Sequence, residues 1–383
     1  MTGPLALDAA PTGTSTAVRA WEQPASRRRI AVFRALQLGD MLCAVPALRA
    51  LRAGEPDALI TLIGLPWVRG FADRFDDLID DVLVFPGMPG MPEQPFDADS
   101  APAFYAAARE RAFDLAIQLH GSGTLSNEVV RRLGARRIAA FCPTPGTADA
   151  PGGSREVSGP ETLVPWPDGH EIERLMAMMR ALGYPAVDTH LSFPLCPADH
   201  TAWGLLARQH GLQPGGYVCV HPGARMLSRR WPVERYAEVV RHVRQRWPVV
   251  ITGAVDELML AHRLAELSGP PVINLCGRTS LGTMAALVAH SRLLLCNDTG
   301  ASHIAAAMDT PSVVVSCGSD AARWAPLDAR RHRVLADYPP CRPCSWQQCP
   351  IGHGCAIHIA VSSVIRAVDE LSAYEPEQKY DHV

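Results

Sequence analysis

The turn formed by Asp298, Thr299 and Gly300 holds the residues whose types and spacing point most directly to chemistry. An apolar run typical of a buried strand precedes it, and a run of small residues typical of a packed helix follows. Unpaired backbone N–H groups and the positive end of a helix dipole favour an anion at such a turn. Gly300 would let the backbone approach a phosphate closely, Thr299 supplies a hydroxyl, and His303 lies one helical turn further along. The pattern indicates a phosphate-binding turn, and an N-cap followed by a packing glycine is the alternative.

Asp40 is the candidate for acid–base chemistry in the first half of the chain. It follows Gly39 where the first expected strand ends, at the edge of a parallel sheet where ligand clefts form. A carboxylate that faces such a cleft can take the proton from a hydroxyl group as a general base. The same carboxylate could instead cap the helix that follows, so both roles stay open.

Charged side chains also follow two of the strands expected in the second half. Arg225, Arg229 and Arg230 lie in the loop after one strand, and Asp256 and Glu257 follow the next. Arginine binds phosphate oxygens in a bidentate way and can stabilise a departing diphosphate. A carboxylate at the second position could accept hydrogen bonds from ribose hydroxyls. Solvated loop arginines and acids at a helix N-terminus are the alternatives.

Four cysteines gather in a proline-rich loop before the last expected helix, with two histidines between them. They are Cys341, Cys344, Cys349 and Cys355. Thiolates select zinc and iron, and a loop can wrap such an ion tetrahedrally. The cluster is therefore a candidate structural zinc or iron site that would pin the last helix. Reduced, packed thiols or a disulfide are the alternatives. The other seven of the eleven cysteines lie at strand-like positions, where they should act as small buried hydrophobes.

Two series of short apolar strands that alternate with helices position these residues. Such a pattern predicts an α/β architecture of parallel sheets with helices on both faces. The first half has expected strands at 30–33, 59–64, 82–85, 115–119 and 137–141, helices at 41–52, 103–111 and around 129–133, a long loop at 142–169 and a helix at 170–182. The second half has expected strands at 217–220, 249–253, 272–275, 293–296 and finally 312–315, and helices from 232, at 281–289 and at about 361–371.

The two halves predict two Rossmann-like, doubly wound domains that face each other across a ligand cleft. A chain of 383 residues also exceeds the size at which one core normally keeps growing. The expected units are a flexible extension at 1–28, an acceptor-binding domain at 29–195, a donor-binding domain at 196–360 with its cysteine-rich loop at 338–358, and a terminal helix and tail at 361–383.

Composition excludes several classes of function. A net charge of −3 gives no electrostatic footprint for nucleic acid, so no nucleic-acid partner is expected. The sequence contains no apolar run of about 18 residues, no secretory signal and neither of the glycine-rich nucleotide motifs G-x-G-x-x-G and Walker A. We therefore expect a cytoplasmic protein and disfavour a nicotinamide enzyme. Asp97-Ala98-Asp99 has the spacing of a metal–diphosphate pair, but a surface loop explains it better because no strand precedes it.

The combined pattern resembles glycosyltransferase family 9, the heptosyltransferase-like inverting transferases with the GT-B fold. The matching motifs run in order along nearly the whole chain. They are Arg34-x-x-x-Leu38-Gly39-Asp40, His221-Pro222-Gly223-Ala224, Arg230-Trp231-Pro232, Thr252-Gly253, Leu275-x-Gly277-Arg278-Thr279-Ser280, Asp298-Thr299-Gly300-x-x-His303 and Arg323-Trp324-x-Pro326.

The resemblance implies an ADP-activated sugar, typically ADP-heptose, held by the second half, and a lipopolysaccharide-core or other envelope glycan held by the first. Asp40 matches the position of the proposed base of the family, and the turn from Asp298 through His303 matches its donor-binding turn. No cofactor is implied for catalysis. An envelope acceptor also implies contact with the cytoplasmic face of the inner membrane. Arg229 departs from the family because many members carry lysine there.

Two other functions fit the same scaffold. One is a nucleotide-sugar epimerase or hydrolase, and the other is transfer of heptose to a protein. The sequence leaves the acceptor, the exact sugar, the linkage and the oligomeric state undetermined.

Overall fold

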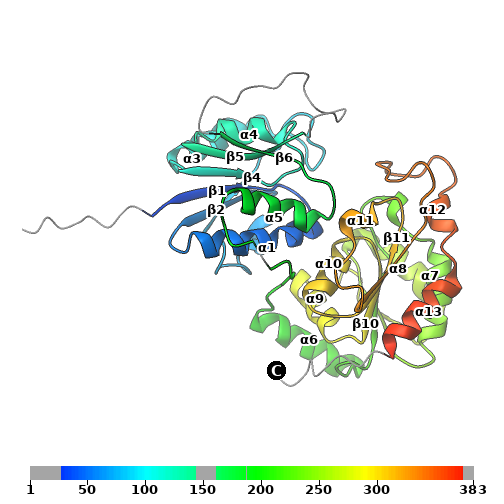
Figure 1. Cartoon of the computed structure of the whole chain (residues 1–383). Coiled ribbons are helices and arrows are strands. Elements are labelled where there is room, and N and C mark those ends of the chain that lie inside the picture. Colours follow the sequence, from blue (N-terminus) through cyan, green and yellow to red (C-terminus); the bar gives the residue numbers. More distant parts are fainter. Residues whose placement is uncertain (1–26, 144–160, 187, 374–383) are drawn as a thin grey trace, which may run out of the picture.

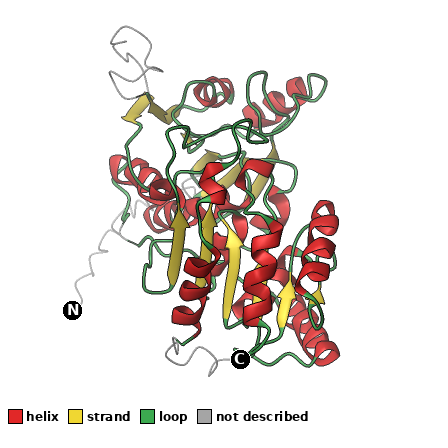
Figure 2. Ribbon diagram, turned by 90° about the vertical axis from the view of Figure 1, so that its right-hand side faces the viewer, coloured by secondary structure: helices red, strands yellow, loops and turns green. Residues whose placement is uncertain are grey.

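The computed structural model describes residues 27–143, 161–186 and 188–373. The expected extension up to residue 26, the middle of the expected long loop and the tail beyond residue 373 lie outside the described residues. The chain forms two six-stranded sheets in which all the strand pairs are parallel, with helices packed around each (Figures 1 and 2). No helix in the described part of the chain is long and apolar enough to cross a membrane.

The first sheet has the strand order β3-β2-β1-β4-β5-β6, which is the order of a Rossmann fold. Its strands are β1 (Arg29–Phe33), β2 (Leu59–Gly64), β3 (Asp81–Val84), β4 (Leu115–Gln118), β5 (Arg137–Cys142) and β6 (Glu161–Pro165). Its helices are α1 (Leu38–Gly54), α2 (Val68–Ala72), α3 (Ala101–Glu110), α4 (Ser126–Arg132) and α5 (Glu171–Ala181).

Burial on both faces explains why these strands are apolar throughout. Along β1, Ile30 and Val32 pack with α1 and α5, whereas Ala31 and Phe33 pack with α3 and α4 on the opposite face. Side chains alternate between the faces of a strand, so a sheet covered by helices on both sides needs apolar residues at every position.

The second sheet has the order β12-β11-β10-β7-β8-β9, so the second domain repeats the strand order of the first. Its strands are β7 (Val218–His221), β8 (Val249–Ile251), β9 (Ile273–Asn274), β10 (Leu293–Asn297), β11 (Ser312–Ser316) and β12 (His332–Ala336). Its helices are α6 (Pro197–His210), η1 (Leu227–Arg229), α7 (Val233–Val243), η2 (Val255–Glu257), α8 (Leu258–Ser268), α9 (Leu281–Ala289), α10 (Gly300–Ala307), α11 (Ala321–Trp324), α12 (Gly354–Ile357) and α13 (Val361–Ser372).

Two strands differ from the expectation. Residues 142–169 were expected to be a loop, but β6 (Glu161–Pro165) completes the first sheet there. The strand at 312–315 was expected to be the last, but β12 (His332–Ala336) pairs beyond it. Both are edge strands whose side chains are only partly buried, so neither has the continuous apolar run by which the inner strands are recognised.

The two domains meet through apolar packing between α1 and α10. A single cluster of buried side chains includes Met41 and Val45 of α1 together with Ala301 and Ile304 of α10. Figure 1 shows α1 and α5 of the first domain on the side that faces α10 and α11 of the second. The carboxyl ends of the central strands of both sheets therefore open toward this junction.

Candidate functional site

Asp40 lies in the first turn of α1, next to Gly39, which contacts the second domain. Its side chain is partly exposed, and the backbone carbonyl of Asp40 accepts a hydrogen bond from Nε of Arg34 at 2.8 Å. Burial raises the pKa of the Asp40 carboxyl, and the positive charge of Arg34 opposes that shift without cancelling it. A carboxylate with a raised pKa is a stronger base, so Asp40 can accept a proton from a hydroxyl group that approaches it.

A buried ion triad beside Asp40 ties the two domains together. Arg34 is fully buried and places Nη2 3.0 Å from Oε1 of Glu171. Arg323 of α11 reaches the other carboxylate oxygen, with Nε and Nη2 at 2.9 and 2.8 Å from Oε2. Burial acts to raise the pKa of Glu171, but the two guanidinium groups outweigh it and hold that pKa below its ordinary value. The carboxylate of Glu171 therefore stays ionised between two cations from different domains.

The turn after β10 has the geometry that its sequence indicates. Thr299 is the N-cap of α10, and its Oγ1 accepts a hydrogen bond from the backbone N–H of Ala301 at 3.4 Å. The Asp298 carboxylate accepts hydrogen bonds from the hydroxyl groups of Ser316 and Ser319. The N-cap role of Thr299 and the hydrogen bonds from the two serines to Asp298 thus explain these two residues of the motif without a ligand. The remaining N–H groups at the start of α10 are the ones that an anion could use.

His303 and Gly300 bring this turn against the first domain. A Cβ atom on Gly39 would lie 2.7 Å from Cδ2 of His303, and one on Gly300 would lie 3.3 Å from Cδ2 of Leu38. Nδ1 of His303 is 3.7 Å from the sulfur of Cys43 on α1. Burial lowers the pKa of His303, so its imidazole is neutral at neutral pH. The motif that contains Asp40 and the turn from Asp298 through His303 are therefore in direct contact.

Of the two acids predicted after β8, the structure buries one and exposes the other. Glu257 is 8% exposed, and one of its oxygens accepts a hydrogen bond from the backbone N–H of Ala254 at 2.9 Å. Its carboxylate also lies 3.8 Å from Nε2 of His221 and 3.9 Å from Nη2 of Arg230. Asp256 points to solvent. Glu257 is thus the acid that joins the loops after β7 and β8.

The three arginines after β7 have different surroundings. Arg229 donates to the carbonyl of Cys344 at 2.9 Å, and Arg230 donates to the carbonyl of Ala224 at 2.8 Å. Arg225 is exposed, and its charge acts across the junction on Glu93 of the first domain. Arg225 is therefore the one of the three whose side chain is exposed.

The cysteine-rich loop is hydrogen-bonded to the strand and turn that hold Asp298. Arg342 donates to the hydroxyl of Ser316 at 2.7 Å, and the same serine donates to Asp298. All four clustered cysteines line one cavity of about 100 Å³ and carry free thiols. However, no three or more His, Cys, Asp or Glu side chains in the described ranges are arranged to hold a metal ion. A tetrahedral site needs four ligands at about 2.0–2.3 Å from one point, so this geometry does not fit the predicted zinc or iron.

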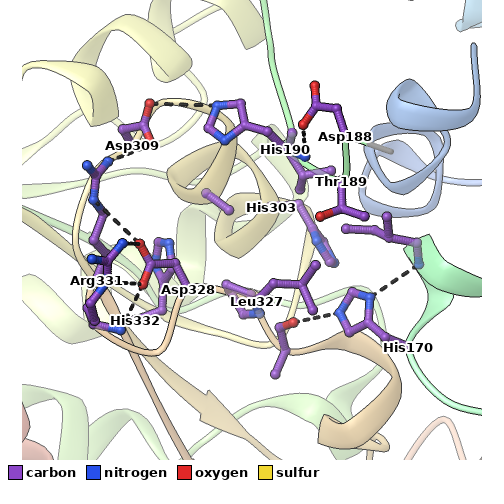
Figure 3. Close-up of a pocket in the computed structure, with 16 residues that line it drawn as sticks. His170, Asp188, Thr189, His190, His303, Asp309, Leu327, Asp328, Arg331 and His332 are labelled. Carbon is purple, nitrogen blue, oxygen red and sulfur yellow. Dashed lines mark hydrogen bonds and ion pairs between the residues drawn. The ribbon is translucent and has the colours of Figure 1, made fainter. Parts of the chain in front are cut away.

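A cavity of about 380 Å³ lies at the hinge between the domains (Figure 3). The residues that line it include His170 at the start of α5, His190 in the interdomain linker and His303 of α10. Nε2 of His170 is 2.7 Å from the carbonyl of Ala325, which is a second link across the junction. Asp40 does not line this cavity.

Sequence reasoning missed Glu171. The motifs contained Arg34 and Arg323, but the carboxylate between them lies 137 residues from one and 152 from the other. Its only local signal was an acid at the start of a helix. Asp97 behaves as expected for a surface loop, since its carboxylate accepts hydrogen bonds from the backbone of Asp99 and Ser100.

Comparison with known proteins gives a consistent result. The profile of glycosyltransferase family 9 (heptosyltransferase) matches residues 103–354. A lipopolysaccharide heptosyltransferase 3 of Escherichia coli is 28% identical over 172 residues, which is 43% of this chain and 49% of that protein. The chain thus spans about half the length of that curated relative.

Solved structures match over nearly the whole fold. A glycosyl transferase of family 9 from Veillonella parvula has a TM-score of 0.72 at 21% identity, covering 90% of this chain and 97% of that one. The Escherichia coli ADP-heptose lipopolysaccharide heptosyltransferase II has a TM-score of 0.65 at 20% identity, covering 90% and 98%. Together with the two Rossmann-like sheets, these likenesses confirm the predicted GT-B fold.

Proposed function

Because the chain belongs to glycosyltransferase family 9, we propose that it is an inverting glycosyltransferase that moves a heptose from ADP-heptose to a saccharide of the bacterial envelope. The names of the relatives support a lipopolysaccharide-core acceptor. The observation that carries the proposal is the contact between Gly39 and His303. It brings the acid at position 40 of one domain to the helix N-terminus at Thr299 of the other.

In the proposed reaction Asp40 acts as the general base. Its carboxylate takes the proton of an acceptor hydroxyl, and the resulting oxygen nucleophile attacks the anomeric carbon of the donor. The bond from the anomeric carbon to the diphosphate oxygen breaks, and ADP leaves with the electron pair from the face opposite the attack. The configuration at the anomeric carbon is therefore inverted. The raised pKa of Asp40 supports this role because it makes the carboxylate a better proton acceptor.

The leaving diphosphate would be stabilised by the second domain. The N–H groups at the start of α10 and the guanidinium of Arg225 are preorganised positive groups, which favour a developing negative charge. Glu257 would accept ribose hydroxyls, since its carboxylate lies between the loops after β7 and β8. A cavity of about 680 Å³ next to Cys276, Gly277 and Arg278 has the volume of a small-molecule site and would take the nucleoside. No metal takes part in these steps.

A thermal-shift screen of nucleotide-diphosphate sugars tests the donor. A ligand that binds only the folded state stabilises it by mass action, so ADP-heptose should raise the melting temperature. UDP- and GDP-sugars should leave it unchanged. Stabilisation by UDP- or GDP-sugars with none by ADP-heptose would overturn the donor assignment.

The release of ADP with and without acceptor separates transfer from the alternative reactions. A transferase should release ADP at a substantial rate only when a saccharide acceptor is present. An epimerase or hydrolase would turn over the donor alone. Incorporation of labelled heptose into a protein, with none into core oligosaccharide, would identify a protein acceptor instead.

A further inference from the structure

A further cavity lies in the first domain, at the carboxyl edge of its sheet. It has a volume of about 180 Å³ and is formed by the segment 90–93 after β3 and the turn 120–126 between β4 and α4. Its polar side chains are Glu93, His120, Ser122, Thr124 and Ser126, and neither arginine nor lysine lines it.

His120 is held in one orientation by the first domain. The backbone N–H of Ala35 donates to its Nδ1 at 3.2 Å, and its ring stacks on Phe33 with centroids 5.2 Å apart. Because Nδ1 accepts a hydrogen bond, the Nε2 nitrogen carries a proton. That nitrogen faces Oε1 of Glu93 at 3.5 Å.

The other oxygen of Glu93 is buried and has no partner. Among the described residues, Oε2 of Glu93 makes no hydrogen bond, although less than 1 Å² of it is exposed. Burial acts to raise the pKa of Glu93, but the contact with His120 and the charge of Arg225 outweigh it and lower that pKa. Glu93 is therefore a carboxylate at neutral pH with a free acceptor atom. A buried unpaired acceptor is costly, and a ligand that donates a hydrogen bond removes that cost.

This cavity adjoins the proposed reaction site. Arg34 donates hydrogen bonds to the backbone carbonyls of both Asp40 and Leu119, and the neighbouring Ala35 donates to Nδ1 of His120 at 3.2 Å. Glu93 is thus in the first domain, in a cavity next to the segment that leads into the proposed base.

We propose that Glu93, oriented by His120, binds a hydroxyl group of an uncharged acceptor sugar next to the hydroxyl that reacts. The hydroxyls of Ser122 and Thr124 in the same cavity suit further sugar hydroxyls, whereas the Ser126 hydroxyl donates to the carbonyl of His120. A phosphate or carboxylate on that sugar ring would face the Glu93 carboxylate at close range, and neither arginine nor lysine lines the cavity. The charge of Arg225, which also acts on Glu93, is assigned to the donor diphosphate. Glu93 therefore selects a neutral ring over a phosphorylated one.

This inference rests on the proposed transferase function, and a matched pair of acceptors tests it. The probes are a heptose-terminated core oligosaccharide and the same oligosaccharide phosphorylated on its terminal heptose. They are compared on the wild type, Glu93→Gln, Glu93→Asp and the control Asp99→Asn, an exposed acid of the same loop that does not line the cavity.

The wild type and Asp99→Asn should prefer the unphosphorylated acceptor. Glu93→Gln should raise the KM for that acceptor by roughly 10- to 100-fold, because a hydrogen bond to a charged group is lost. It should also narrow the preference between the two acceptors, because the repelling charge is gone. Glu93→Asp should lose acceptor affinity but keep the discrimination, since the charge remains while its reach shortens. The kcat and the thermal shift with ADP-heptose should change little in either variant.

Equal use of both acceptors by the wild type, or a KM in Glu93→Gln within twofold of the wild type, would overturn the inference alone. Absence of any stabilisation by ADP-heptose would overturn the proposed function instead. Calorimetric binding of the two oligosaccharides to the free protein then still decides whether Glu93 selects a neutral sugar.

Discussion

The two domains share one strand order but bring different groups to the cleft. The carboxyl edge of the first sheet presents the acids Asp40 and Glu93, whereas that of the second presents Arg225 and the N–H groups at Thr299 beside the acid Glu257. The scaffold fixes where side chains can meet, and the loops after the strands fix what they can do.

The ends of corresponding strands show the same contrast. After β1, the first strand of the first sheet, Arg34 is fully buried and paired with Glu171, so its charge holds the domains together. After β7, the first strand of the second sheet, His221 and Arg225 keep access to solvent. The residue after β1 thus joins the two domains, whereas the residues after β7 can still contact a ligand.

The largest effect is expected from Asp40→Asn, which removes only the basic oxygen from the first domain. Transfer should fall by about 10²- to 10⁴-fold in kcat, which is the usual contribution of a positioned general base. Binding of ADP-heptose, measured by thermal shift, should stay as in the wild type because the second domain is unchanged. Near-normal turnover at saturating donor would show that Asp40 is not the base.

Glu171→Gln should cause the next largest effect, on stability. It leaves the buried Arg34 without a counter-charge and separates Arg323 from its partner, and breaking a buried ion pair costs about 3–5 kcal/mol. The midpoint of urea unfolding reports the loss. The control is Glu173→Gln on the same helix, whose exposed pair with Arg180 should contribute no more than about 1 kcal/mol. Equal effects of the two substitutions would refute the buried triad as a stabilising link.

Gly39→Ala tests the contact between the domains directly. The added Cβ would lie 2.7 Å from the His303 ring, so the domains must shift apart, at about 1–3 kcal/mol for an overpacked contact. We expect a lower melting temperature together with a lower kcat. Gly70→Ala is the matched control because a Cβ atom there meets nothing within 4 Å. A Gly39→Ala variant with wild-type turnover would argue against the functional importance of this contact.

Arg225→Gln should weaken donor binding by about tenfold, as expected for one charge-assisted hydrogen bond. The KM for ADP-heptose in the transfer assay measures this effect. Arg366→Gln, at an exposed position of α13, should leave that KM unchanged. If both substitutions have the same effect, general surface charge rather than a specific contact guides the donor.

The smallest effect concerns pH. Asp40 must be deprotonated to act as a base, and burial raises its pKa. As the pH is lowered, kcat/KM should therefore begin to fall at a higher pH than it would if the base were an ordinary aspartate. Arg34→Gln would remove a positive charge that lowers the pKa of Asp40. In that variant the loss of activity on the acidic side of the pH profile should occur at a still higher pH. A shift of this loss of activity to lower pH in Arg34→Gln would contradict the assignment of Asp40 as the base.

Local patterns predicted the parts of the molecule that depend on local physics. The inner strands, the helices α1, α3, α7, α9 and α13 and the turn from Asp298 through His303 follow from apolar runs, caps and glycine. The helices α6 and α8 were not predicted, and α6 buries only Asp199 and Ala207, so it lacks a clear apolar stripe. The edge strands β6 and β12 were not predicted because partly buried strands lack a continuous apolar run. Glu171 and the Glu93–His120 pair escaped because their partners are distant in sequence. The cysteine spacing correctly gathered four thiols in one loop, but spacing does not specify the distances that a metal requires.

The most direct test of the central claim is a crystal structure of Asp40→Asn with ADP-heptose. We predict that the diphosphate lies against the N-terminus of α10 at Thr299 and that the anomeric carbon of the heptose faces residue 40 across the domain junction. A donor bound elsewhere, or one whose anomeric carbon points away from residue 40, would contradict the account.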